Sequence, residues 1–197
     1  MKQSIIIALL LLAVTNIANA ADIAAGKGKA AMCAGCHGAD GNSISPEWPN
    51  LAGQNAAYLT KQIKDFRDGA RVNAQMAPMV AALTDADAEN IGAYYASLDA
   101  KAGATKEEFV ALGSQIYTGG VTGVMACTAC HGPKGNGLDA AGFPKVAGQQ
   151  INYVINQLNN FKNGSRSNDS SVMMNNIAAA MTEEQITAVA NYLSGLY

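Results

Sequence analysis

The chain has 197 residues, with 13 basic and 15 acidic side chains and a formal net charge of −2. The charges are dispersed and form no basic patch or run, so nucleic acid is excluded as a partner. The chain contains four cysteines and two histidines, and all six lie in two short motifs described below.

The first twenty residues have the three parts of a secretory signal peptide. Lys2 provides the positive charge, residues 5–14 form an apolar run, and Ala18-Asn19-Ala20 is a small-residue cleavage site. We expect residues 1–20 to be removed, which leaves a net charge of −3. The apolar run is too short to span a bilayer and no other stretch approaches one, so we expect no transmembrane segment in the mature chain.

The remaining sequence contains one pattern twice. Residues 49–54 recur as residues 144–149 at an offset of 95, and five positions behind them recur at the same offset: Tyr58, Gln62, Phe66, Gly69 and Arg71 become Tyr153, Gln157, Phe161, Gly164 and Arg166. From Thr84, which recurs as Thr182, the offset is 98, so the second copy has three extra residues near 168–172. This tandem duplication predicts two domains, residues 21–100 and 107–197, joined by a linker at 101–106.

Each copy is predicted to form three helices and no strand, so the fold class is all-α. In the first copy, Asp22 and Asn55 are expected to cap two helices, and Gly69 to end the second. Thr84 is expected to cap the third. The predicted buried faces are Leu59, Ile63 and Phe66 on the second helix, and Ile91, Tyr94, Tyr95 and Leu98 on the third.

The second copy repeats this plan with its own signals. Thr105 with Glu108, and Thr182 with Gln185, have the spacing of capping boxes. The second helix of this copy has an apolar face formed by Val154, Leu158 and Phe161.

Each copy contains one Cys-x-x-Cys-His motif, Cys33 to His37 and Cys127 to His131. Two thiols one helical turn apart can each form a thioether with a haem, and the adjacent His can ligate the iron. The motifs therefore predict two covalently bound haem c groups, attached through Cys33, Cys36, Cys127 and Cys130, with His37 and His131 as iron ligands. The alternatives are redox dithiols or one metal held by four pooled sulfurs.

The second axial ligand of each iron must be a residue other than His, because both histidines are already committed. Met, Lys or an open position remain, and Met76 and Met174 are the only methionines at the same place in both copies, each eight residues before the repeated threonine. They are therefore predicted to be the second ligands. Met79, which aligns with Ile177, and Met181, which aligns with Leu83, are predicted to be packing residues, as are Met32 and Met125.

The twin Cys-x-x-Cys-His-Gly motifs, the Pro-x-(Leu/Val)-Ala-Gly-Gln loop after each, the downstream Met and the final Tyr-bearing helix resemble the di-haem cytochrome c4 family. The resemblance implies two cytochrome c folds about a pseudo-twofold axis, each wrapped around one covalent haem. It implies that the Pro49 and Pro144 carbonyls orient His37 and His131, and that the haem propionates lie near the interface. Arg71 and Arg166 could reach those propionates or be solvated surface residues.

The same resemblance implies a soluble or peripherally membrane-associated carrier that passes electrons from a membrane quinol-oxidising complex to a terminal oxidase or other reductase. Because c-type haem is attached outside the bacterial cytoplasm in this family, it also implies a periplasmic location. Trp48 aligns with Phe143, and Tyr95 with Leu193, so the two haem pockets are expected to differ and their potentials to be unequal.

Three other functions are compatible with haem motifs. The chain could be the haem subunit of a periplasmic dehydrogenase or reductase complex, a di-haem peroxidase-like enzyme, or a sensor or store of haem. A peroxidase needs an exchangeable iron site and a distal acid or base, for which this chain has no spare His. We therefore expect a carrier and not an enzyme.

Overall fold

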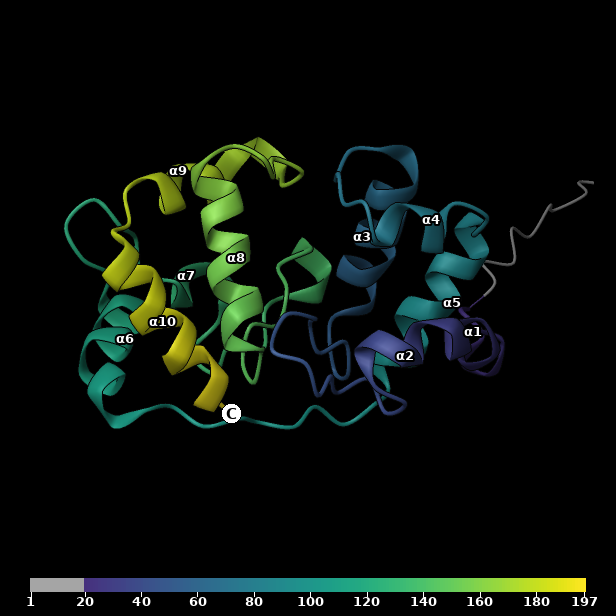
Figure 1. The fold of residues 1–197 in the computed structure, drawn as a ribbon, viewed down its shortest axis with the longest axis horizontal. Coiled ribbons are helices and arrows are strands. Elements are labelled where there is room, and N and C mark those ends of the chain that lie inside the picture. Colours follow the sequence, from purple (N-terminus) through teal and green to yellow (C-terminus); the bar gives the residue numbers. More distant parts are fainter. Residues whose placement is uncertain (1–19) are drawn as a thin grey trace, which may run out of the picture.

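The computed structural model describes residues 20–197, and the predicted signal peptide lies outside these residues except for Ala20. The chain forms two helical domains side by side, joined by an extended connection that runs along one edge (Figure 1). The N-terminal domain contains α1 (Ile23–Ala30), α2 (Ala34–His37), α3 (Ala56–Asp68), α4 (Met76–Val80) and α5 (Asp85–Ala96). The C-terminal domain contains α6 (Glu107–Gly119), α7 (Thr128–His131), α8 (Ile151–Lys162), α9 (Met173–Ala179) and α10 (Glu183–Gly195).

The all-α fold class is confirmed. Between residues 20 and 197 the only β pairing consists of two isolated bridges, and three short 3₁₀ turns lie at Ala31–Cys33, Asp139–Ala141 and Ser170–Val172. Each domain has the three predicted long helices, plus a one-turn helix at the cysteine motif and a short helix at the proposed Met ligand. None of the helices in the described part of the chain is long and apolar enough to cross a bilayer.

Three of the predicted helix starts are confirmed. The Asp22 carboxylate accepts hydrogen bonds from the N–H groups of Ala24 and Ala25, at 2.8 and 3.0 Å. Thr84 forms a capping box with Asp87, as Thr182 does with Gln185. Gly69 ends α3 with φ of 82°, as predicted for a left-handed helix stop.

Two of the predicted caps are wrong because the side chains have partners elsewhere. Asn55 precedes α3, but its amide donates to the Phe143 carbonyl of the other domain, at 2.7 Å. The α3 N–H of Ala57 donates instead to the Asp139 carboxylate of that domain, at 3.0 Å. Thr105 donates to the Asn191 carbonyl, and α6 begins two residues later at Glu107.

Each domain has its own apolar core. In the N-terminal domain Ala30, Leu59, Ile91 and Tyr95 are buried together, whereas the C-terminal core contains eleven buried residues, among them Ile116, Tyr117 and Ile186. The predicted apolar faces of α3, α5 and α8 contribute to these cores. Met32 and Met125 were predicted to be core residues, but they are 51% and 61% exposed, because the turns before the attachment cysteines direct them outward.

In each domain the first and last long helices cross at a glycine. A Cβ on Gly26 of α1 would lie 2.0 Å from the Asn90 carbonyl oxygen of α5, and one on Gly113 of α6 would lie 2.6 Å from the Ala188 carbonyl oxygen of α10. These distances are far inside van der Waals contact with rigid backbone. Glycine is therefore required for the two helices to pack this closely.

Substituting Gly26 by Ala should destabilise the N-terminal domain by about 2 kcal/mol, because the added methyl forces α1 away from α5. Gly28 lies on the same helix with open space around its Cα. Substituting Gly28 by Ala should therefore stabilise the protein by about 0.5 kcal/mol through helix propensity. Chemical denaturation of the two variants measures both effects, and equal stability of the two would contradict the close crossing.

Candidate haem-binding sites and the domain interface

The two cysteine motifs have the same local structure. Cys33 ends a 3₁₀ turn and is followed by α2, which holds Cys36 and His37, while Cys127 precedes α7, which holds Cys130 and His131. The helical turn places the two thiols of each motif one turn apart, as thioether attachment requires. None of the four cysteines forms a disulfide.

Each motif histidine is fixed by a proline carbonyl. The Nδ1 atom of His37 lies 2.9 Å from the Pro49 oxygen, and Nδ1 of His131 lies 2.9 Å from the Pro144 oxygen. Because a carbonyl can only accept, Nδ1 carries the proton in both rings and Nε2 retains its lone pair. Burial lowers the pKa of both imidazoles despite these bonds. Each ring is therefore held as a neutral ligand with Nε2 available for a metal.

The cysteine environments oppose the alternative of redox dithiols. Burial raises the pKa of Cys33, and it raises that of Cys127 to about 11. Redox-active thiols need a lowered pKa, because the thiolate is the reactive form. A single metal held by pooled sulfurs is not supported either, since residues 20–197 contain no group of three or more His, Cys, Asp or Glu side chains placed to hold an ion.

The two predicted Met ligands occupy matching positions. Met76 begins α4 and its N–H donates to Asn73 Oδ1 at 2.9 Å, while Met174 is the second residue of α9 and its N–H donates to Asp169 Oδ2 at 2.8 Å. Both side chains are partly buried. The other methionines differ: Met181 is buried, as expected for packing, whereas Met79 is 39% exposed and is not a core residue.

The residues around each motif fit a haem. In the N-terminal domain Cys33 packs on the apolar core beside Leu51, Ile63 and Leu83. In the C-terminal domain Cys127 and Met174 pack on the core with Val146 and Ile177. Each site therefore combines unpaired thiols and a free imidazole nitrogen with an apolar wall, which suits a large apolar ring that carries an iron. When bound, haem supplies a one-electron redox centre.

Tyr117, which the sequence reasoning missed, lies at the second site. Its ring is fully buried and its hydroxyl donates to the Gly132 carbonyl at 2.6 Å. Burial, followed by the neighbouring Cys127, raises its pKa well above the usual value. In the N-terminal domain the buried tyrosine beside the first cysteine is Tyr95, whose pKa is raised in the same way. Because Tyr95 belongs to α5 and Tyr117 to α6, internal alignment does not pair them.

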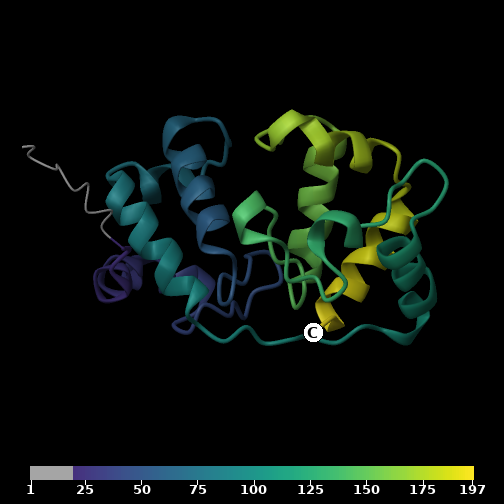
Figure 2. The same ribbon diagram turned by 180° about the vertical axis from the view of Figure 1, so that it is seen from behind.

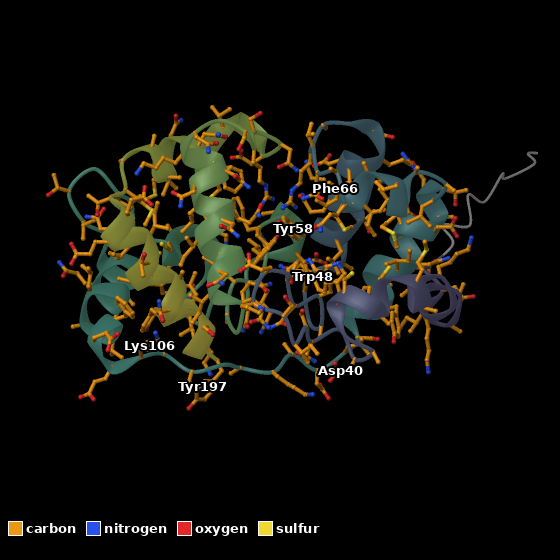
Figure 3. All side chains as sticks on the ribbon, viewed as in Figure 1. Asp40, Trp48, Tyr58, Phe66, Lys106 and Tyr197 are labelled. Carbon is orange, nitrogen blue, oxygen red and sulfur yellow. The ribbon has the colours of Figure 1, made fainter. Side chains whose placement is uncertain are left out.

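The repeated arginines are buried between the domains and are not solvated surface residues. Arg71 and Arg166 are each 8% exposed, and their guanidinium groups lie over Phe66 and Phe161 at 4.5 and 4.3 Å from the ring centres. Figure 3 shows Tyr58 and Trp48 between the two domains, and Phe66 on α3 beside them. The repeated residues thus build the domain interface.

The interface bonds are reciprocal. Arg71 donates to Tyr153 and Gln157 of the other domain, at 3.2 and 2.7 Å. Arg166 donates to their equivalents Tyr58 and Gln62, at 3.0 and 3.2 Å. Asn168, next to the three-residue insertion of the second copy, adds to this interface by donating to Gln62 at 3.0 Å. The reciprocal pairs are those expected of two copies related by a twofold axis. The view from behind shows the two domains side by side, with α3 and α8 on their facing sides (Figure 2).

Comparison with known proteins agrees with this architecture. The cytochrome c family model matches residues 23–99 and 110–196. Cytochrome c4 of Pseudomonas aeruginosa is 43% identical over 201 residues and covers the full length of both chains. The thiosulfate dehydrogenase electron acceptor of Stutzerimonas stutzeri is 39% identical over 87% of this chain and 82% of its own.

A solved structure shares the fold. The crystal structure of reduced recombinant cytochrome c4 from Pseudomonas stutzeri superimposes with a TM-score of 0.88 at 39% identity, covering 90% of this chain and all of that one. The likeness to cytochrome c4 thus extends over both domains, in sequence and in fold. The chain belongs to the cytochrome c4 family, with two tandem cytochrome c domains.

Proposed function

We propose that this protein is a periplasmic di-haem electron carrier. Haem c is attached through Cys33 and Cys36 in the N-terminal domain and through Cys127 and Cys130 in the C-terminal domain. His37 with Met76, and His131 with Met174, ligate the two irons. The domain boundaries are those of the repeat, residues 21–100 and 107–197, with residues 101–106 as the linker.

The observation that carries this proposal is the matched pair of sites. Each has a neutral histidine fixed by a proline carbonyl and a methionine at the start of a short helix, in the same register of both domains. Two firm protein ligands leave an iron no vacancy for oxygen or peroxide, and a thioether ligand favours reduced iron. Such sites suit electron transfer, and cytochrome c4 proteins are electron carriers and not enzymes.

The donor we propose is a membrane quinol-oxidising complex and the acceptor a terminal oxidase. A second donor deserves testing, because one close relative is described as a thiosulfate dehydrogenase electron acceptor. The protein would then receive electrons from a periplasmic dehydrogenase. The two alternatives are distinguished by what reduces the protein: quinol with membranes, or a soluble dehydrogenase with its substrate.

Substituting Met76 by Ala tests the proposed ligand set. We expect one of two irons to lose its thioether ligand, so that the weak far-red charge-transfer band of the oxidised protein falls by about half while haem content is unchanged. Met79, exposed on the same helix α4, is the matched control. If the Met79→Ala variant loses the band and Met76→Ala keeps it, the assignment of Met76 is wrong.

A further inference from the structure

Two buried glutamines join each domain to the loop of the other domain whose proline carbonyl binds the motif histidine. Gln54 and Gln149 occupy equivalent positions in the two copies and are 6% and 8% exposed. The Gln149 side chain accepts from the Asn50 N–H at 2.8 Å and donates to the Asn50 carbonyl at 3.0 Å. The Gln54 side chain likewise accepts from the Lys145 N–H and donates to the Lys145 carbonyl, both at 2.7 Å.

These bonds fall on the peptide groups that hold the histidines. The Asn50 N–H and the Pro49 carbonyl belong to one planar peptide, whose carbonyl is bonded to His37 Nδ1. The Lys145 N–H and the Pro144 carbonyl form the equivalent peptide, bonded to His131. Each glutamine of one domain thus continues a chain of hydrogen bonds that ends on the histidine of the other domain.

A hydrogen bond to the N–H of a peptide has two effects on its carbonyl. It fixes the orientation of the peptide plane, and it polarises the group so that the carbonyl becomes a stronger acceptor. A stronger acceptor at Nδ1 makes the imidazole a more basic ligand and fixes its ring. More basic ligation favours oxidised iron and therefore lowers the reduction potential.

We propose that Gln54 and Gln149 are positioning residues that act across the interface. Gln149 fixes the ring orientation and the basicity of His37, and Gln54 does so for His131. This inference rests on the proposed function, because it assigns the two histidines to haem iron. The reduction potential of each iron then depends on a side chain of the opposite domain. Loss of either glutamine should raise the potential of the iron in the other domain.

The two glutamines should differ in the size of their effect. The loop at Asn50 has additional support, because the Asn50 side chain donates to the Gly148 carbonyl and accepts from the Ser43 N–H, each at 2.8 Å. Lys145, at the equivalent position, has no side-chain amide to make these bonds. Removing Gln54 should therefore disturb iron 2 more than removing Gln149 disturbs iron 1.

The test compares holoprotein variants Gln149→Leu and Gln54→Leu, in which a slightly shorter apolar side chain replaces the amide at the interface. The matched control is Gln150→Leu. Gln150 crosses the same interface to the Ser43 carbonyl, at 2.6 Å, and to the Asn50 side-chain oxygen, at 3.3 Å, but forms no bond with the Pro49 peptide group. The reduction of each iron is followed in a potentiometric titration by nuclear magnetic resonance of the haem methyl groups. The Met76→Ala and Met174→Ala variants show which methyl resonances belong to which haem.

The expected result is a crossed pattern. Gln149→Leu shifts the reduction equilibrium of iron 1, and Gln54→Leu shifts that of iron 2 by on the order of tenfold, with the Nδ1 proton resonance of the same histidine displaced. Gln150→Leu leaves both equilibria in place. Shifts confined to the iron of the substituted domain, equal shifts in all three variants, or none would overturn the inference. Protein that carries no haem would instead refute the proposed function, and this inference with it.

Discussion

Replacing Cys33 and Cys36 together by Ala is expected to remove one haem per chain and to unfold the N-terminal domain. The buried apolar cluster of this domain contains four residues, and domains of about 80 residues have marginal cores of their own. A covalently held haem would supply the missing apolar centre. Circular dichroism and limited proteolysis of the purified variant measure the loss of helix and locate it.

The corresponding Cys127 and Cys130 variant is the internal comparison. The C-terminal core contains eleven buried residues, with Ile116, Tyr117 and Ile186 almost fully enclosed. This domain should therefore retain more of its helix without haem than the N-terminal domain does. Native helix content in a chain with all four cysteines replaced and no haem would contradict the role of haem as a core component.

Substituting Arg71 by Ala is expected to lower the free energy of unfolding by about 3 kcal/mol. The guanidinium donates to Gln62 of its own domain and to Tyr153 and Gln157 of the other, so its removal leaves buried acceptors without a donor. It also removes the contact with Phe66. Denaturant unfolding followed at both haems should show two separated transitions in place of one.

Arg67 provides the control for this substitution. It lies in the last turn of α3, pairs with the exposed carboxylates of Asp68 and Asp85, and donates to the Leu83 carbonyl of its own domain. Exposed ion pairs contribute little to stability, so Arg67→Ala should unfold much as the unsubstituted protein does. If Arg71→Ala and Arg67→Ala unfold alike, the interface does not depend on the buried guanidinium.

The helices and the repeated features could be predicted because their signals are local. Asp22, Thr84 and Thr182 cap helices through bonds to residues two or three positions away, and such spacing is visible in a sequence. The apolar faces of the long helices follow from periodicity alone. Internal repetition alone marks Tyr58, Gln62 and Arg71 as a set.

The wrong helix caps concern side chains whose partners lie far away in the sequence. Asn55 and Thr105 have the composition of helix caps, but their bonds run to Phe143 and Asn191. Arg71 could not be placed either, because its partners belong to the other domain. The role proposed for Gln54 and Gln149 could not be predicted for the same reason, because their partners also lie in the other domain. Propensity and spacing carry no information on how two domains pack.

The proposed ligation and electron-carrier function are tested by an optical spectrum of the purified mature protein, oxidised and reduced, with haem quantified per chain. Two haems per chain, a far-red charge-transfer band in the oxidised form and no response to carbon monoxide in the reduced form are predicted for His and Met ligation at both irons. A high-spin signal, or carbon monoxide binding at either iron, would show an open coordination position. That result would contradict the electron carrier proposed here and favour an enzyme or a sensor.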